Sequence, residues 1–279
     1  MEKNNFIERS LMGALSFLQE SIFSEEYAAR RGFLQARQAR IKVLAMFFLL
    51  LAVLFSKNIY FLITIYIFCL LLAFVSSIHL GFFLKRTWVF IPLFSLFIAL
   101  PALFDIFSPG TPVLSFNLFN FTLNITSQGI ASASFFFVRV LTSVSLCILL
   151  VLTTRHHVLL KVLRVLGVPQ VFVMTLGMCY RYIYLFIEII QNTYLAIKSR
   201  VGQIVSVKGG QGIVAWNIAS LWQRSYQMHT EVYHAMLSRG YSGEPKTMDE
   251  FHATYKDWFL LGVTILTFVF SLWQNQYLN

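Results

Sequence analysis

The hydrophobic positions of this chain form long, nearly unbroken runs, and a two-faced pattern of polar and apolar positions develops between residues 155 and 256. A helix needs about 20 mainly apolar residues to cross the roughly 30 Å of hydrocarbon in a bilayer. The runs therefore predict five transmembrane helices, near residues 41–56, 58–77, 87–107, 128–153 and 257–274. Only Ser56-Lys57-Asn58 separates the first two, which predicts a tight helical hairpin.

Two stretches among these runs carry turn-forming residues. Pro92 and Pro101 fall in the third predicted span, where a membrane helix tolerates them as kinks if its neighbours satisfy the freed carbonyls. Residues 108–128 start with Pro109-Gly110 and then alternate polar and apolar positions. This alternation fits a short external hairpin or a reentrant piece, and the pattern leaves both open.

Composition excludes a large water-soluble domain. Hydrophobic residues make up 57% of the 279 residues and charged residues only 12%, whereas a soluble domain carries about 25% charged residues. We expect an all-α integral membrane protein with about five transmembrane helices and further long cytoplasmic helices.

The basic residues predict the topology. Lys85 and Arg86 lie between the second and third spans, and residues 155–256 carry eleven lysines and arginines. Residues 108–128 and the tail after Trp273 carry none, so Lys57 stands alone on the sparse side. By the positive-inside rule the N-terminus and residues 155–256 are cytoplasmic and the C-terminus is external. The net charge of +10 is then a matter of topology, and no nucleic-acid partner is expected.

Four parts follow from this topology. They are a cytoplasmic or interfacial segment (1–40), transmembrane helices one to four (41–154), a cytoplasmic helical region (155–250), and the last span with a short external tail (251–279). No cleavable signal is evident in the first part. Its apolar positions predict one amphipathic helix on the membrane surface. Its apolar positions are Phe6, Leu11, Leu15, Phe17, Leu18 and Ile22, and a basic collar follows at Arg30, Arg31, Arg37, Arg40 and Lys42.

Arg139 is a charge inside the fourth predicted span. A charge at that depth costs several kcal/mol by insertion scales unless it is paired or reaches the headgroups, about 2.5–3.5 kcal/mol at a helix centre. One interpretation is that Arg139 snorkels or pairs with backbone carbonyls. The other is a polar contact within the membrane, with Asp105 or a partner subunit.

The region 155–250 predicts three helices. The first, His156–Leu166, is short and amphipathic, and Gly167-Val168-Pro169 ends it. The second begins after Pro169, closes at Gly202, and is nearly 50 Å long at about 1.5 Å per residue. The third runs from about Gly212 to Gly240, after a flexible loop at Gly209–Gly212.

The two long helices end with the same sequence pattern, Ala-x-x-Ser-Arg. It comprises Ala196, Ser199 and Arg200 in one helix and Ala235, Ser238 and Arg239 in the other. The helix macrodipole favours a cation in the last turn, and Gly240 is a natural helix stop. One such arginine would ordinarily be a solvated cation. Two in consecutive helices favour a duplicated docking device.

Catalytic and metal-binding motifs do not emerge from the sequence. No GxxxxGK[ST] loop occurs, Cys69, Cys147 and Cys179 stand apart, and His156-His157 diverge on a helix. We expect no catalytic residue, no metal site and no cofactor on this chain, and therefore no enzyme activity of its own.

In combination, the motifs resemble a known family over roughly residues 30–275. They are Arg139, Thr153-Thr154, Gly167-Val168-Pro169, Arg181-Tyr182 with Glu188, and the two Ala-x-x-Ser-Arg ends, the second continuing to Tyr241. The chain is similar to the transmembrane T component of energy-coupling factor (ECF) transporters, within the cobalt-transport, CbiQ-like branch. The resemblance implies a scaffold in a bacterial or archaeal plasma (inner) membrane. It would join two ATP-binding cassette ATPase subunits, which hydrolyse ATP, to a substrate-binding membrane (S) subunit.

The resemblance also implies roles for residues. Arg200 and Arg239 would dock into the ATPases, at the ends of what would be coupling helices. Their frame would be Ala196, Ser199, Ala235, Ser238 and Gly240, with structural support from Arg139, Pro169, Arg181 and Glu188. The first motif departs from the family's usual Ala-Arg-Gly: Ser199 precedes Arg200, Val201 follows it, and glycine comes one position later, at Gly202.

The function expected from this resemblance is energy coupling in an ECF importer for cobalt or nickel. One alternative is the same role for a vitamin or another micronutrient. A further alternative is a self-sufficient secondary transporter or channel, which predicts several ionisable residues at bilayer depth and inverted repeats. An intramembrane enzyme would need a catalytic constellation that the sequence does not offer.

Overall fold

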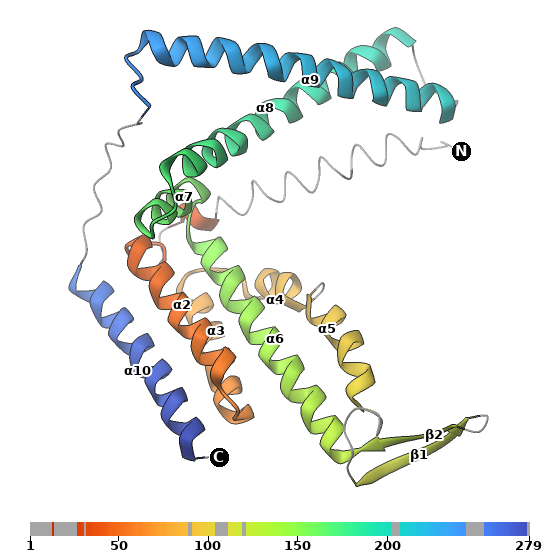
Figure 1. Cartoon of the computed structure of the whole chain (residues 1–279), viewed down its shortest axis with the longest axis vertical. Coiled ribbons are helices and arrows are strands. Elements are labelled where there is room, and N and C mark those ends of the chain that lie inside the picture. The colour runs from red at the N-terminus through yellow and green to blue at the C-terminus, as the bar shows by residue number, and fades with distance from the viewer. Residues whose placement is uncertain are drawn as a thin grey trace. The chain divides into compact units, whose positions relative to one another are not determined.

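The computed structural model describes residue 13 and residues 27–30, 32–88, 91–103, 111–118, 121–201, 207–243 and 254–277. The chain divides into two compact units (Figure 1). We call residues 24–159 and 251–279 the membrane unit, and residues 1–23 and 160–250 the long-helix unit. The predicted amphipathic helix at the N-terminus lies outside the described residues, apart from Gly13.

The membrane unit is mainly helical. Its elements are α2 (Ala39–Phe55), α3 (Ile59–Val75), α4 (Leu80–Trp88), α5 (Ile91–Ala99), a 3-10 turn η1 (Leu100–Leu103), strands β1 (Pro112–Leu118) and β2 (Phe121–Thr126), α6 (Ser127–Thr153) and α10 (Tyr255–Tyr277). Side-chain caps begin two of the helices. Asn58 accepts a hydrogen bond from the backbone N–H of Tyr60 at the start of α3, and Thr126 accepts one from Gly129 at the start of α6.

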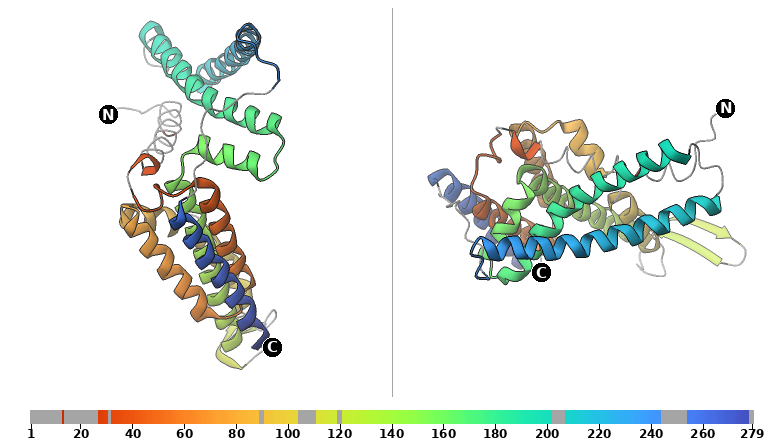
Figure 2. Two further views of the ribbon diagram at one scale, coloured as in Figure 1. Left: turned by 90° about the vertical axis from the view of Figure 1, so that its left-hand side faces the viewer. Right: turned by 90° about the horizontal axis from the view of Figure 1, so that it is seen from above.

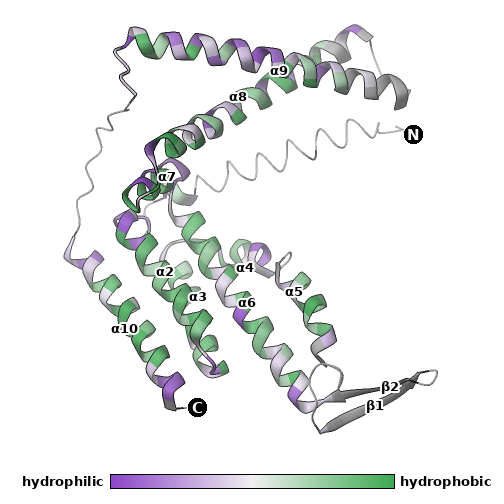
Figure 3. Cartoon of the chain, viewed as in Figure 1, coloured by the Kyte–Doolittle hydropathy of each residue, from purple (hydrophilic) through white to green (hydrophobic). Residues whose placement is uncertain are grey.

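The core of the membrane unit lies between α2, α3 and α6. Among its fully buried side chains are Leu49, Leu62, Cys69, Leu146 and Leu149. These residues recur at helical spacing, so each helix turns one apolar stripe inward. Most residues of these helices are hydrophobic (Figure 3), and many of their large hydrophobic side chains are exposed, among them Phe47, Leu54, Ile67 and Leu71. A surface that is apolar on all sides is what a helix in lipid requires.

Polar contacts show the relative directions of these helices. The Lys42 ammonium reaches the Thr153 carbonyl at one end of the α2–α6 pair, and Arg139 reaches the Ser56 carbonyl at the other, so α2 and α6 are antiparallel. Along α10 the Ser271 hydroxyl donates to the Ala52 carbonyl at 3.0 Å, while Asp257 pairs with Arg37. The first and last helices of this unit are therefore parallel neighbours (Figure 1).

The structure confirms the all-α membrane fold. Four helical stretches among the described residues are long and apolar enough to cross a membrane: Leu80–Ala99, Ser127–Thr153, Gln170–Thr193 and Tyr255–Gln276. The helix at Ile59–Val75 is also apolar but shorter. Helices lie at all five predicted positions, and the start of α8 is a further apolar stretch. The chain is a multi-pass membrane protein.

The third predicted span is placed differently in the structure. We predicted 87–107, but the helical stretch starts at Leu80, and Lys85 and Arg86 lie exposed in the last turn of α4. In the sequence pattern, Lys85 and Arg86 favour a loop, yet a helix can carry both charges on its exposed side. Pro92 is the second residue of α5, where proline costs no helical hydrogen bond, and Pro101 lies in the 3-10 turn η1.

Residues 112–126 form the hairpin rather than a reentrant piece. Strands β1 and β2 pair antiparallel, with Leu118 opposite Phe121 and Pro112 opposite Thr126. The Ser127 backbone N–H donates to the Thr111 carbonyl at 3.1 Å. This bond closes the hairpin directly onto the start of α6.

The long-helix unit holds α8 (Gln170–Val201) and α9 (Val207–Ser238), which follow α7 (His156–Val165) and run in opposite directions as two long rods (Figure 2). The short amphipathic helix predicted at residues 156–166 is confirmed as α7. Gly167 ends it at φ 98°, with Val168 N–H bonded to the Leu163 carbonyl. The prediction of a loop at Gly209–Gly212 is wrong, because α9 already begins at Val207. Glycine costs a helix only about 1 kcal/mol per residue, which neighbouring helical residues can offset.

Candidate functional site

The ends of α8 and α9 share one local geometry. In α8 the Ser199 hydroxyl donates to the Ala196 carbonyl at 2.9 Å. In α9 the Ser238 hydroxyl donates to the Ala235 carbonyl at 3.0 Å. In both cases the serine bonds back to its own helix, three residues earlier. The repeated sequence pattern is thus also a repeated structure, and each serine is followed directly by its arginine.

Gly240 ends α9 in a Schellman motif. Its φ is +80°, the Tyr241 N–H donates to the Met236 carbonyl, and the Gly240 N–H donates to the Leu237 carbonyl, each at 3.0 Å. A residue with a Cβ is strained at this φ. The prediction of a helix stop at Gly240 is confirmed, and Arg239 is the last residue before the chain turns away.

Tyr241 ties this turn to the beginning of α8. Its hydroxyl lies 3.0 Å from the Met174 sulfur and 3.0 Å from the Gly243 carbonyl oxygen. The end of α9 is thereby fixed beside the start of α8. The sequence marked Tyr241 only as part of a motif, and nothing in it pointed to Met174, which lies 67 positions away.

Both arginines are exposed. Arg200 lies in the last turn of α8 and Arg239 directly follows α9. Among the described residues, neither is recorded in an ion pair. Each guanidinium therefore stays solvated beside the negative end of a helix macrodipole, available to a carboxylate or carbonyl outside this chain.

The other residues named from the sequence lie apart from these ends. Pro169 lies directly before α8, and its carbonyl accepts hydrogen bonds from the N–H groups of Phe172 and Val173 in the first turn. Arg181 and Glu188 are exposed along the middle of α8. The structure brings neither of them to the arginine ends.

Arg139 belongs to the membrane unit and pairs with a backbone carbonyl. Its Nη2 lies 2.6 Å from the Ser56 carbonyl oxygen, and its guanidinium carbon lies 4.5 Å from the centre of the Phe135 ring. This confirms the interpretation in which the charge of Arg139 pairs with a backbone carbonyl. Asp105, the alternative partner within the chain, lies outside the described residues.

Long apolar surfaces accompany the arginine ends. No described side chain of α8 or α9 is buried. The exposed fraction is 80% for Trp222, 72% for Tyr226 and 71% for Val171. On α9, Ile218, Trp222, Tyr226, Tyr233 and Leu237 recur at helical spacing and are all exposed. Exposed apolar surface of this extent is typical of contacts with a protein or a membrane.

The side chains at the two helix ends are suited to binding a partner. It offers two cations, hydroxyls already used within their own helices, and an apolar stripe. Within the described ranges, no group of three or more His, Cys, Asp or Glu side chains is placed to hold a metal ion. The arrangement can bind an acidic partner and transmit force along rigid helices.

A comparison with known protein families finds a match to the sequence of this chain. The family of cobalt transport proteins, CbiQ, matches residues 31–249, which include both arginine ends and most of the membrane unit. The chain belongs to the CbiQ cobalt transport family. Membership makes this CbiQ-family chain a component of a membrane transport system.

Two relatives come from the archaeon Methanocaldococcus jannaschii. The uncharacterized protein MJ1571 is 34% identical over 273 residues, which cover 98% of this chain and 93% of the relative. The uncharacterized protein MJ1089 is 29% identical over 221 residues, which cover 75% of this chain and 77% of the relative. The likeness to MJ1571 thus extends over the membrane unit and the long-helix unit together.

Proposed function

We propose that this CbiQ-family chain is the energy-coupling T subunit of an ECF-type importer. It would transmit the movement of two ATPases to a substrate-binding membrane subunit. The observation that carries the proposal is the pair of matching helix ends, each closing on an exposed arginine after a serine bonded to its own helix. The frame of each end is small: Ala196 and Ser199 in one, Ala235, Ser238 and Gly240 in the other.

The position of the two arginines supports two separate docking partners. Tyr241 holds the Arg239 end beside Met174, near the start of α8, whereas Arg200 lies in the last turn of α8. The helix between these points rises about 1.5 Å per residue, so the two cations stand about 40 Å apart along α8. A single small binding site cannot reach both, but two ATPase subunits can take one end each.

The exposed stripe of α9 supports the transmission step. Trp222 and Tyr226 present large apolar surfaces that are exposed in the part of the chain that the structure describes. A partner in the membrane would bury these side chains. A shift of the arginine ends would then move α9 as a whole and be transmitted to that partner. A helix suits this role because its backbone hydrogen bonds resist bending.

The buried charges of the membrane unit do not favour a self-sufficient transporter or channel. Such a protein needs ionisable groups free to meet a solute at bilayer depth. Here the Lys42 ammonium and the Arg139 guanidinium both bond backbone carbonyls, and Asp257 pairs with Arg37. These groups serve the packing of the unit.

We further propose that the solute is cobalt or nickel, selected by the substrate-binding subunit, with vitamin or other micronutrient uptake as the alternative. The protein would lie in a bacterial or archaeal plasma membrane with a cytoplasmic N-terminus. The basic residues support this orientation. Arg37 and Lys256 line one end of the membrane unit and Lys42 bonds Leu34 there, whereas Lys57 lies in the turn between α2 and α3 at the other end.

The docking role is tested by co-purification. The chain, carrying an affinity tag, is co-expressed with the ATPases and membrane proteins encoded beside it, as wild type, Arg200→Ala and Arg239→Ala. Removing one partner of a buried charge pair costs about 2–5 kcal/mol, so either variant should lose most of its bound ATPase. Arg224→Ala is the matched control, because Arg224 is exposed on α9 away from the helix end. Equal ATPase recovery from all four proteins would refute the role.

A further inference from the structure

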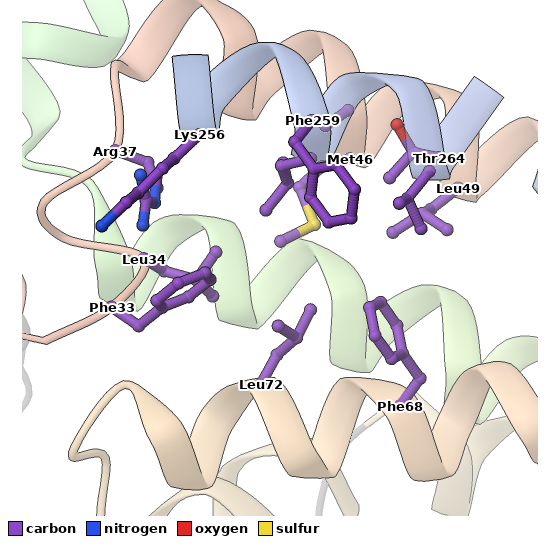
Figure 4. Close-up of a pocket in the computed structure, with 13 residues that line it drawn as sticks. Phe33, Leu34, Arg37, Met46, Leu49, Phe68, Leu72, Lys256, Phe259 and Thr264 are labelled. Atoms are coloured by element: carbon purple, nitrogen blue, oxygen red, sulfur yellow. The ribbon is translucent and has the colours of Figure 1, made fainter. Parts of the chain in front are cut away.

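The membrane unit contains a groove between α2, α3 and α10, closed at one end by residues 33–37 (Figure 4). Its volume is about 580 Å³. Volumes of about 300–1,000 Å³ are typical of sites for small molecules.

The groove has one cationic end and an apolar remainder. Arg37 and Lys256 stand together at one end, and Met46, Phe259, Leu72 and Phe68 line the space beyond them (Figure 4). The lining along α10 extends from Lys256 to Thr264, or about 12 Å at 1.5 Å per residue. Half of the roughly 30 Å hydrocarbon core is about 15 Å. The groove therefore spans most of one leaflet.

The cationic end keeps a net positive charge. Arg37 is partly neutralised, because Asp257 lies 3.6 Å away, and its guanidinium also covers the Phe33 ring at 4.4 Å. Lys256 is exposed. Lys42 adds a third cation nearby, bonded to the carbonyl of the groove residue Leu34 at 3.0 Å. This end of the groove thus carries two cations in its lining, Arg37 and Lys256, with Asp257 paired to the first and Lys42 buried behind Leu34.

We propose that this groove binds one chain of an anionic phospholipid, with the lipid phosphate held by Lys256 and Arg37. The hydrocarbon would lie along Met46, Leu72 and Phe259, and the headgroup would remain at the basic end of the bundle. A bound lipid would fill the space between α3 and α10 and stabilise their packing. This inference does not depend on the energy-coupling role.

The test uses the full chain in nanodiscs containing equal amounts of phosphatidylglycerol and phosphatidylcholine. Native mass spectrometry then counts the lipids that stay bound after the disc is released. Wild type should retain one lipid per chain, enriched in phosphatidylglycerol. Arg37 is not a clean probe, because its loss would leave Asp257 unpaired, so the variants change Lys256 and the groove wall.

Two matched pairs separate headgroup binding from chain binding. Lys256→Gln should keep a bound lipid but lower the preference for phosphatidylglycerol about fivefold, while Lys85→Gln, outside the groove, should not change it. Val263→Trp fills the groove and should abolish retention of the lipid. Val269→Trp, on the same helix but outside the lining, should leave it intact. Equal retention by both tryptophan variants, or the same phosphatidylglycerol preference in Lys256→Gln as in Lys85→Gln, would overturn the proposal.

Discussion

At the scale of single residues, the membrane unit places two cations, Lys42 and Arg139, against the C-terminal ends of neighbouring helices. Lys42 donates to the carbonyl of Thr153, the last residue of α6, and Arg139 donates to the carbonyl of Ser56, just after α2. The last carbonyls of a helix have no partner within it, and the macrodipole makes that end negative. Each cation thus satisfies an orphan carbonyl of the neighbouring helix.

Replacing Lys42 with methionine should destabilise the membrane unit. Methionine is also long, but its side chain is apolar, so the Leu34 and Thr153 carbonyls lose their donor. Burying unpaired acceptors costs about 1–3 kcal/mol. We expect a lower midpoint of thermal unfolding in detergent, and no change in Lys85→Met, whose lysine is exposed on α4. An unchanged midpoint in Lys42→Met would contradict the contact.

Arg139 should act on stability and not on solute recognition. In Arg139→Leu the Ser56 carbonyl loses its donor at 2.6 Å, so we expect a loss of about 1–3 kcal/mol of stability. Arg139→Lys should recover part of it, since an ammonium can still reach a carbonyl. The measurement is thermal unfolding together with solute uptake by the assembled transporter. Normal stability with abolished uptake in Arg139→Leu would instead favour a polar contact with the solute or a partner.

Sequence reasoning reached some of these residues and not others. It identified Arg139 because a charge within an apolar run is visible locally, and it allowed for a carbonyl partner. It placed Lys42 only in a basic collar, since its partner on α6 lies 111 positions away. The Asp257–Arg37 pair was missed for the same reason. Partners set by helix register in three dimensions leave no local signal.

At the scale of elements, the geometry at the end of α9 is the feature most open to test. Gly240→Ala forces a Cβ into φ +80°, which costs about 1–2 kcal/mol. We expect the last turn of α9 to fray, with faster amide hydrogen exchange around Met236 and weaker ATPase binding. Gly212→Ala is the matched control, because Gly212 is helical and a Cβ there meets nothing within 4 Å. The account is wrong on this point if both variants behave alike.

Most elements could be predicted from the hydrophobic runs, because lipid imposes long apolar helices. Pro169 and Gly240 marked helix ends correctly, since each has a fixed backbone preference. The errors lie where two signals compete. Lys85 and Arg86 favour a loop in the sequence but lie in α4, and the glycines at residues 209–212 favour a flexible loop but lie in α9. The hairpin at residues 112–126 carried the alternation of strands, but that pattern alone could not exclude a reentrant piece.

At the scale of the whole molecule, the two units differ in how many of their described side chains are buried. The membrane unit has a buried core from three helices, and its deepest charges have partners within the chain. In the long-helix unit, no described side chain of α8 or α9 is buried. Trp222 and Tyr226 are exposed along α9, and under the proposed function other subunits would cover them. The match to the cobalt transport family over residues 31–249 agrees with this view.

The most direct test of energy coupling is uptake of radiolabelled cobalt by proteoliposomes. They contain the complete complex of this chain, its ATPases and its substrate-binding membrane protein, with ATP supplied on the ATPase side. We predict ATP-dependent uptake that falls about tenfold or more in Arg200→Ala and in Arg239→Ala, but not in Arg224→Ala. This chain alone should transport nothing. Uptake by the chain alone, or full ATP-dependent uptake by both end variants, would contradict the account.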